Sequence, residues 1–422
     1  MIDAFHPDAS QAAAIDLAER ERVLVLTGAP GRGKTWTLTE ILRRWEAAGA
    51  RRVVLCAPTG KAAKRMTEET RRPASTIHRL LAQEDGPIGA ADAVVIDECS
   101  MVDTLLLARL LAAVPASARL LIVGDVDQLP SIGAGQVLRD LIDSGSVPVA
   151  RLTEIHRQAG GEASWICQNA DRILDGQMPH ADNDRATDYF WREVPAGPDG
   201  AEAAAAQIID AVAWAARRFG VDPVRDVAVL CPKRKEDAPL RVGRFNEALQ
   251  AKYNPPGVRK MEWAHPNGET IRVGDRVRHT VNSYEIDCSN GGSSKGVFNG
   301  EVGHVKSIDR TKRKGRPDLL RIEVDLGDRT ATYTEANAVE MVLAYASTVH
   351  GAQGSGYPVV VIAVHDVDAW MLRRPLLYTA LTRAERCAIL VGSDKGLRKA
   401  VATDGDYYRR TRLAVRLRDV AA

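Results

Sequence analysis

The sequence predicts an α/β protein with two parallel sheets and a small β-barrel inserted into the second. The evidence is the pattern of apolar residues. Short apolar runs alternate with helical stretches through residues 1–150, and the same rhythm returns after residue 220. Residues 269–333 instead alternate apolar and polar side chains between Gly and Asn turns. Runs that are apolar throughout are typical of parallel strands covered by helices on both faces, whereas alternation is typical of strands with one solvated face.

The elements of each sheet follow from these runs. The first sheet is expected from apolar runs at 23–26, 53–57, 93–97 and 120–125. Amphipathic segments between them predict helices at 35–48, 61–70 and 104–114. The second sheet is expected from apolar runs at 227–232, 359–364 and 388–392. Its helices are expected at 201–219, 244–253 and 376–384. We therefore expect one α/β domain at 1–150, with a short segment at 82–92, and a second at 151–268 and 334–422, interrupted by the insertion at 269–333.

Composition narrows the classes of protein. Apolar residues make up 45% and charged residues 27% of the 422 residues, which excludes a mostly disordered chain. The net charge of +2 supplies no global field, so any contact with nucleic acid must be local. No apolar run reaches the length of a membrane span, the start lacks a secretory pattern, and the six cysteines form no CxxC pair. We expect an intracellular protein with reduced thiols, in the cytoplasm of a cell or of the host of a phage.

The segment GAPGRGKT (residues 28–35) carries the strongest chemical signal. It lies between an apolar strand and an amphipathic helix and fits the pattern GxxxxGK[ST]. Gly28, Gly31 and Gly33 allow the backbone amides to turn inward, and the start of the helix adds positive potential. Lys34 can reach the outer phosphates, and the Thr35 hydroxyl can bind Mg²⁺. These residues predict an NTP site.

Acidic and amide side chains follow two strands of the first sheet. Asp97 and Glu98 follow the run at 93–97, and Gln128 follows the run at 120–125. A carboxylate at a strand end beside a phosphate loop can bind Mg²⁺, and its neighbour can polarise the attacking water. We assign Asp97 to the metal, Glu98 to the water and Gln128 to sensing the terminal phosphate. Arg157 and Arg383 are candidates for stabilising charge on the transferred phosphoryl group, although an arginine at either position is also consistent with a surface ion pair.

Taken together, the motifs resemble those of superfamily 1B DNA helicases, in particular the RecD-like group that includes the phage Dda helicase. Seven elements occur in the family's order, at 28–35, 57–66 with 75–81, 94–101, 124–135, 152–158, 346–356 and 376–384. Their sequences are GAPGRGKT, APTGKAAKRM with STIHRLL, VVIDECSM, GDVDQLPSIGAG, LTEIHRQ, ASTVHGAQGSG and LLYTALTRA.

This resemblance implies two RecA-like domains that bind ATP and Mg²⁺ between them, with an SH3-like insertion in the second. Gln11 resembles the glutamine that reads the adenine base, and the resemblance implies that Gly354 belongs to the nucleotide site. On sequence alone, a glutamine at this position is more often just the exposed residue of an N-terminal helix. The family's path for single-stranded DNA implies contacts with the phosphates of the DNA strand. The residues expected to make them are Pro58, Thr59, Gly60, Lys61, Thr76, His78, Thr348 and His350. The helix that carries His78 is also consistent with a packed histidine.

Two departures from the family pattern affect the expected function. Only residues 82–92 stand where RecD-like helicases carry a β-hairpin pin, and they contain no aromatic residue. Gly356 stands where the family has a glutamate that contacts ribose. We expect a monomeric, ATP-dependent helicase or translocase that moves 5′ to 3′ on single-stranded and fork DNA in replication, recombination or repair, together with other proteins of those processes and away from membranes. An RNA-directed helicase and a DNA-binding NTPase switch without processive unwinding are the alternatives.

Overall fold

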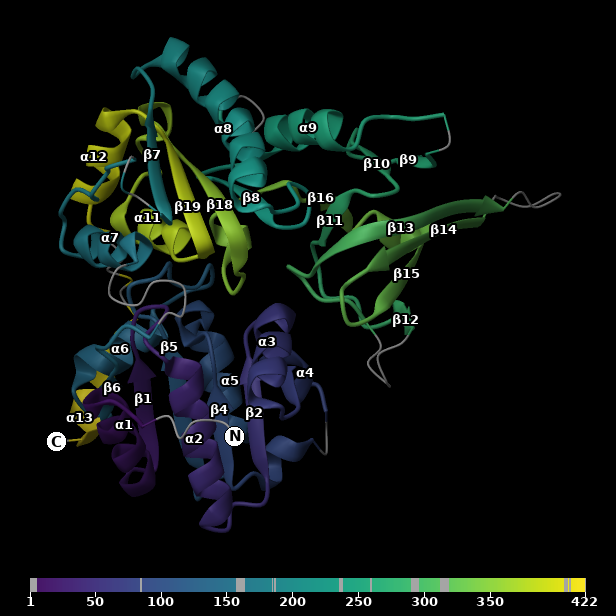
Figure 1. The fold of residues 1–422 in the computed structure, drawn as a ribbon. Coiled ribbons are helices and arrows are strands. Elements are labelled where there is room, and N and C mark those ends of the chain that lie inside the picture. The colour runs from purple at the N-terminus through teal and green to yellow at the C-terminus, as the bar shows by residue number, and fades with distance from the viewer. Residues whose placement is uncertain are drawn as a thin grey trace. The chain divides into compact units, whose positions relative to one another are not determined.

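The computed structural model describes residues 6–83, 86–156, 164–183, 185, 187–234, 238–258, 260–289, 296–311, 319–405, 409 and 411–421. The chain forms two compact units (Figure 1). Unit 1 comprises Met1–Leu174 and Asp404–Ala422, and unit 2 comprises Asp175–Thr403. Both contain the parallel sheet that the apolar runs predict, which confirms the fold class.

Unit 1 is built on a six-stranded sheet in which every pairing is parallel, in the order β3-β2-β4-β5-β1-β6. Its strands are β1 (Val23–Thr27), β2 (Val53–Ala57), β3 (Ala74–Thr76), β4 (Ala93–Ile96), β5 (Arg119–Gly124) and β6 (Val149–Arg151). Its helices are α1 (Ala9–Arg20), α2 (Lys34–Ala47), α3 (Gly60–Thr70), α4 (Ile77–Leu81), α5 (Thr104–Ala113), α6 (Val137–Ser144), α7 (Trp165–Leu174) and α13 (Leu413–Ala421). Short 3₁₀ helices occupy Pro87–Ala90 and Cys99–Met101.

Helices cover both faces of this sheet, as the unbroken apolar runs predict. Leu24 and Leu26 of β1 pack with α1, α2 and Met66 of α3 on one face. Val25 points to the other face, where α4, α5 and α6 pack. Because successive residues of a strand point to opposite faces, each strand must be apolar at every position. The carboxyl ends of the strands remain as the polar edge.

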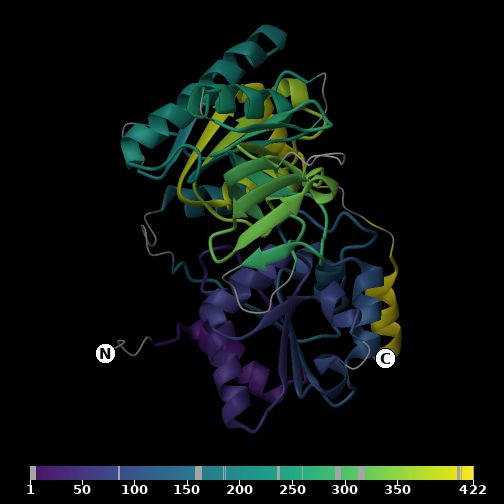
Figure 2. The same cartoon turned by 90° about the vertical axis from the view of Figure 1, so that its right-hand side faces the viewer.

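The C-terminal segment belongs to unit 1, which differs from the expected boundary at 334–422. Leu413 and Leu417 of α13 pack against the core beside α6, and Figure 2 shows α13 in yellow against this unit. The Thr411 hydroxyl donates to Asp140 Oδ2 at 2.6 Å, and Arg418 donates to the carbonyl oxygens of Asp143 and Ser144. Residues 151–174 also lie in unit 1, because β6 pairs with β1 and Asp171 of α7 forms an ion pair with Arg32.

Unit 2 contains a second parallel sheet in the order β17-β8-β18-β19-β7. Its strands are β7 (Tyr189–Glu193), β8 (Val227–Cys231), β17 (Ala346–Thr348), β18 (Tyr357–Val364) and β19 (Ala384–Gly392). Its helices are α8 (Pro198–Phe219), α9 (Val242–Tyr253), α10 (Glu335–Ala338), α11 (Arg374–Leu381) and α12 (Asp394–Ala402), with 3₁₀ helices at His350–Ala352 and Asp366–Asp368. The long helix α8 packs against β8, β18 and β19.

The inserted segment forms an antiparallel sheet in the order β12-β15-β14-β13-β11-β16. Its strands are β11 (Arg276–His279), β12 (Asp287–Ser289), β13 (Val302–Thr311), β14 (Leu319–Asp325), β15 (Thr330–Thr334) and β16 (Met341–Leu343). A separate hairpin pairs β9 (Glu262–Ala264) with β10 (Thr270–Arg272). The sheet thus continues ten residues past the expected end at 333, because β16 pairs with β11.

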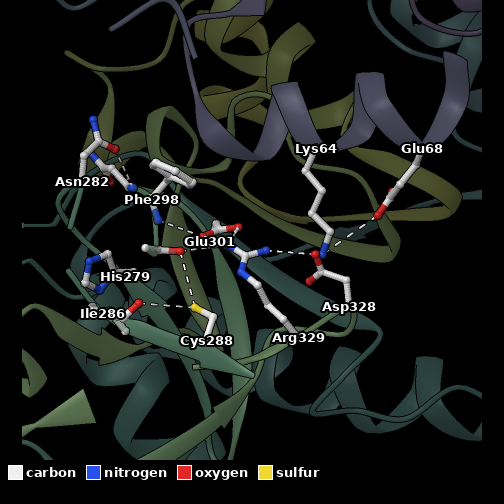
Figure 3. A network of polar contacts seen from close by, with 12 residues as sticks. Lys64, Glu68, His279, Asn282, Ile286, Cys288, Phe298, Glu301, Asp328 and Arg329 are labelled. Atoms are coloured by element: carbon white, nitrogen blue, oxygen red, sulfur yellow. Dashed lines mark hydrogen bonds and ion pairs between the residues drawn. The ribbon is translucent and has the colours of Figure 1, made fainter. Parts of the chain in front are cut away.

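A buried ion pair connects the loops of the inserted sheet (Figure 3). Arg329 Nη2 donates to both carboxylate oxygens of Glu301, at 2.8 and 2.9 Å, and both side chains are 6% exposed. The Phe298 amide donates to the same carboxylate at 2.8 Å, and Arg329 also pairs with Asp328. These contacts satisfy charges that would otherwise be costly to bury.

The six cysteines are free thiols, as expected. In the described part of the chain, the helices are too short or too polar to cross a bilayer.

Candidate nucleotide-binding site and nucleic-acid path

The loop between β1 and α2 has the geometry of a phosphate cradle. Gly31 and Gly33 have φ angles of 82° and 77°, which side chains other than glycine rarely adopt. A Cβ at residue 33 would overlap Nε2 of Gln11, and one at residue 28 would stand 3.1 Å from Leu152. The loop therefore keeps its amides at the start of α2, where backbone N–H groups and the helix dipole favour an anion.

The two polar side chains that begin α2 are held by their own unit. Lys34 Nζ donates to the carbonyl oxygens of Gly28 at 2.6 Å and Ala29 at 3.2 Å, so the ammonium group lies over the loop. The Thr35 hydroxyl donates to Glu69 Oε2 of α3 at 3.0 Å. The Lys34 ammonium and the Thr35 hydroxyl are thus held beside the glycine loop, by contacts that a nucleotide or a metal ion can replace.

Asp97 and Glu98 lie directly after β4, at the carboxyl edge of the sheet. Glu98 has a left-handed backbone, with φ of 52°, and its amide donates to Asp97 Oδ1 at 2.8 Å. Burial raises the pKa of Asp97 to about 7, with help from the charge of Glu98, while Lys34 and Arg65 oppose the rise. A divalent cation would relieve this cost, and the Asp97 carboxylate and Thr35 hydroxyl are oxygen ligands of the kind that Mg²⁺ prefers. The residues present therefore fit a magnesium ion.

Gln128 lies beside this site after the neighbouring strand β5. It is buried, and its Nε2 donates to Asp125 Oδ2 at 3.1 Å. Because β4 and β5 are adjacent and parallel, Asp97 and Asp125 follow neighbouring strand ends at the same edge.

Gln11 is fully buried. It is therefore not the exposed helix residue that its sequence alone would also allow. Its Oε1 accepts from the Asp8 amide at 3.1 Å, and the Asp8 carboxylate accepts from the Gln11 amide at 2.9 Å, so the pair forms a capping box at α1. Its Nε2 has no hydrogen-bond partner among the described residues. A buried amide donor beside the phosphate loop fits a nucleotide base as its acceptor.

His156 and Asp8 belong to the same cluster, and sequence reasoning did not identify them. The His156 amide donates to the Gly31 carbonyl at 2.7 Å, and its ring Nε2 contacts Asp8 Oδ2 at 2.5 Å. Burial alone would raise the pKa of Asp8, but hydrogen bonds from Ser10, Gln11 and His156 outweigh it and lower the pKa to about 2. The motif at 152–158 contains His156 and could have indicated it, but within this motif only Arg157 was assigned a role. Arg157 itself lies outside the described residues.

Arg383 is buried in unit 2 at the end of α11. Its guanidinium donates to the carbonyl oxygens of Thr379 and Ser355, each at 3.2 Å. Gly354 precedes Ser355 with a φ of 69°, so this turn depends on glycine. Arg383 is thus held by the turn that contains Gly354.

The space left by Gly356 is filled by another carboxylate. A Cβ at residue 356 would overlap Oε1 of Glu385, the second residue of β19. Unit 2 therefore does present a carboxylate at this turn, although it comes from a different segment than the family pattern predicts.

The expected nucleic-acid contacts of unit 1 gather at the ends of β2 and β3, which are adjacent and pair Ala57 with Thr76. Thr59 caps α3 by accepting from the Ala62 amide at 3.2 Å, and Thr76 caps α4 by accepting from the Arg79 amide at 3.2 Å. Pro58, Gly60 and Lys61 flank the first cap. His78 is exposed, so it is not a packed core histidine.

The expected contacts of unit 2 lie at the end of β17 and in the turn after it. The Gly351 amide donates to Thr348 Oγ1 at 3.0 Å, which closes the turn. His350 lies in that turn, and burial lowers its pKa. The short segment at 82–92 contains a 3₁₀ turn at Pro87–Ala90 with Ile88 buried, and its described residues include no strand.

Three family models match the chain. Residues 6–189 match an AAA domain, residues 245–316 match an ATP-dependent RecD-like DNA helicase SH3 domain, and residues 343–391 match a UvrD-like helicase C-terminal domain.

Two curated relatives align over nearly the whole chain. The ATP-dependent RecD2 DNA helicase of Deinococcus radiodurans is 38% identical over 419 residues, which cover 97% of this chain and 52% of that protein. The RecBCD enzyme subunit RecD of Mycobacterium tuberculosis is 31% identical over 431 residues, which cover 93% of this chain and 70% of that protein. The chain spans about half the length of the first relative.

Solved structures share the fold at low identity. The Pif1 helicase from Candida albicans has a TM-score of 0.54 at 14% identity, with 99% of each chain covered. A Bacteroides Pif1 bound to ssDNA has a TM-score of 0.52 at 16% identity, with 92% of each chain covered.

Proposed function

Because this chain belongs to the RecD-like family of superfamily 1B DNA helicases, we propose that it is an ATP-driven motor that moves 5′ to 3′ along single-stranded DNA and unwinds duplex DNA. The observation that carries the proposal is the glycine loop of unit 1, where Lys34 Nζ donates to the loop carbonyl oxygens and its charge acts on Asp97. Such a site binds and hydrolyses a nucleoside triphosphate. The direction of movement rests on family resemblance.

We assign the chemistry of hydrolysis to this loop and its neighbours. The amides from Gly28 to Gly33 and Lys34 bind the phosphates, and Gln11 donates to the base. Thr35 and Asp97 would hold Mg²⁺, which supplies charge neutralisation at the phosphates when bound. Glu98 accepts a proton from the attacking water, and Gln128 couples the state of the terminal phosphate to the rest of unit 1.

Two arginines complete the proposed site from outside the loop. Arg383, and Arg157 from the segment after β6, stabilise the negative charge that spreads over the equatorial oxygens during phosphoryl transfer. Gly354 holds the turn that anchors Arg383. In this proposal closure of the two α/β domains on ATP brings these charges to the phosphates, and hydrolysis releases them.

The proposed track for DNA lies over the carboxyl edges of both sheets. It comprises the contacts named above from Pro58 to Lys61, from Thr76 and His78, and from Thr348 and His350. Amides and hydroxyls of caps and tight turns can bind phosphates without reading sequence, which suits a motor. We propose that the protein works as a monomer inside the cell, on single-stranded and forked DNA in replication, recombination or repair.

ATP turnover with and without a single-stranded oligonucleotide tests the motor, and duplexes carrying a 5′ or a 3′ tail test its direction. We expect turnover to rise with single-stranded DNA and unwinding to require the 5′ tail. Turnover that ignores DNA would refute the motor, whereas unwinding only from a 3′ tail would refute the direction alone. Matched DNA and RNA strands in the same assay separate a DNA motor from an RNA-directed helicase.

A DNA-binding NTPase switch is the second candidate, and the short segment at 82–92 favours it. A switch hydrolyses ATP on DNA but does not move. Displacement of streptavidin from a biotinylated strand requires movement, so ATP-dependent displacement would exclude the switch.

A further inference from the structure

Arg278 and Arg234 are two positive side chains of unit 2, near enough for the charge of Arg234 to act on Arg278. Arg278 lies on β11 of the inserted sheet and is half-buried, and Arg234 follows β8 and is exposed. Burial lowers the pKa of the Arg278 guanidinium, and the charge of Arg234 lowers it further. Among the described residues, Arg278 has no carboxylate as an ion-pair partner. Two like charges repel each other, and an anion that binds between them relieves this repulsion.

The turn after β17 lies against Arg278. A Cβ added to Gly351 would stand 3.4 Å from Arg278 Nη1, 3.1 Å from Thr348 Oγ1 and 2.8 Å from Ser347 Oγ. Glycine at 351 therefore lets the guanidinium approach the turn. The Ser347 hydroxyl is buried and has no hydrogen-bond partner among the described residues. The guanidinium thus lies beside two hydroxyl groups, one of which lacks a partner.

Strand pairing fixes this arrangement. β17 pairs with β8 so that Thr348 lies opposite Cys231, and the chain from Pro232 to Arg234 leaves the sheet at the same edge as the turn. β11 pairs with β16, which directly precedes β17. Three segments that are far apart in the sequence therefore meet at one strand end.

We propose that Arg278 and Arg234, together with the Thr348 hydroxyl, bind one phosphodiester group of single-stranded DNA. The inserted sheet then contributes a direct contact to the DNA track of the second α/β domain. A guanidinium presents two parallel N–H donors that match a phosphate, and such a contact is independent of base sequence. This inference rests on the proposed DNA motor and names a contact that the motor uses.

Replacing Arg278 by Met tests the site, because Met fills a similar volume without charge. Binding of a fluorescent oligothymidine of about 15 nucleotides, measured by anisotropy without nucleotide, should weaken roughly ten-fold. The slope of log affinity against log salt should fall by about one, since one phosphate contact is lost. The melting temperature should rise by about 2 °C, because the like-charge contact is relieved.

Three further variants complete the experiment. Arg234→Ala should weaken DNA binding and reduce the salt slope in the same way, and Arg278→Lys should retain part of the affinity. Arg321→Ala is the matched control, because Arg321 lies on β14 of the same sheet, is exposed and pairs with Glu323. It removes one positive charge and should leave both affinity and slope unchanged.

The outcomes separate the site from the motor. Equal affinity and equal salt slope in wild type, Arg278→Met and Arg234→Ala would overturn the phosphate site and leave the motor standing. A wild-type protein that does not bind the oligonucleotide would overturn the motor itself. Weakened binding in Arg278→Met with a lowered melting temperature and an unchanged slope would show a structural role and also overturn the site.

Discussion

The side-chain amide of Gln11 lies against the backbone of Gly33, in the space that a Cβ of residue 33 would occupy. The same glutamine closes the capping box of α1 through Asp8, and Asp8 contacts His156, whose amide binds the Gly31 carbonyl. The phosphate loop is therefore held from outside by the first helix and by the segment after β6. These contacts leave Gln11 Nε2 buried without a partner among the described residues, as a donor ready for a base.

Replacing Gly33 by Ala should both strain and displace this cluster. A left-handed φ of 77° costs an L-residue about 1–2 kcal/mol, and the new Cβ overlaps Gln11. We expect the midpoint of thermal unfolding to fall and ATP affinity to fall at least ten-fold. Gly49→Ala is the control, because Gly49 has a φ of 104° with open space around it. If the two variants lose ATP binding equally, contact with Gln11 is not the cause.

Replacing Lys34 by Ala should abolish turnover and spare the fold. The ammonium group makes two hydrogen bonds to loop carbonyls, so its loss should change the free energy of unfolding by only about 1 kcal/mol. Turnover should fall by roughly 100-fold or more, because a positioned cation at the phosphates is removed. Lys399→Ala, an exposed lysine of α12, should be inert in the same ATPase assay. Residual turnover near that of wild type would remove Lys34 from the site.

Replacing Arg329 by Met should strongly destabilise the inserted sheet. Among the described residues, the change leaves the buried Glu301 carboxylate with the Phe298 amide as its remaining donor, and an uncompensated buried charge costs about 3–5 kcal/mol. The double change Arg329→Met with Glu301→Leu should recover most of this loss in urea unfolding. Breaking the exposed pair of Arg398 and Asp394 should cost less than about 1 kcal/mol. A double variant as unstable as the single one would contradict this account.

Lowering the pH should destabilise the fold of unit 2, because His279 becomes protonated. Burial lowers the pKa of this histidine from 6.5 to about 4, and the nearby Glu340 only partly opposes the shift. Between these two pKa values the unfolded chain binds a proton that the folded chain does not. The contribution of His279 to the free energy of unfolding is therefore complete above pH 6.5 and is lost as the pH falls towards 4. The loss amounts to roughly 3 kcal/mol at most.

Urea unfolding of wild type and His279→Gln between pH 7.5 and about 4.5 measures this effect. The variant should show a shallower dependence on pH over that range. Parallel curves for the two proteins would mean that His279 does not titrate as inferred.

Features set by neighbouring residues were predictable from the sequence. The glycine loop at 28–35 and the pair Asp97 and Glu98 are contiguous motifs, and their strands carry unbroken apolar runs. The strand β7 was missed because its sequence YFWRE is short and mixed in polarity, as befits an edge strand with one neighbour. The return of residues 404–422 to unit 1 was also missed, since nothing local to α13 specifies α6 as its partner.

The sequence by itself determined the fold class, the family and the phosphate loop, because each is written in the spacing of adjacent residues. Only the tertiary structure decided that Gln11 is buried against Gly33, that Glu385 fills the space at Gly356, and that Arg278 lies beside the turn of Thr348 and Gly351. The physical reason is strand pairing and packing over long sequence separations. These bring side chains together whose distance along the chain carries no signal of contact.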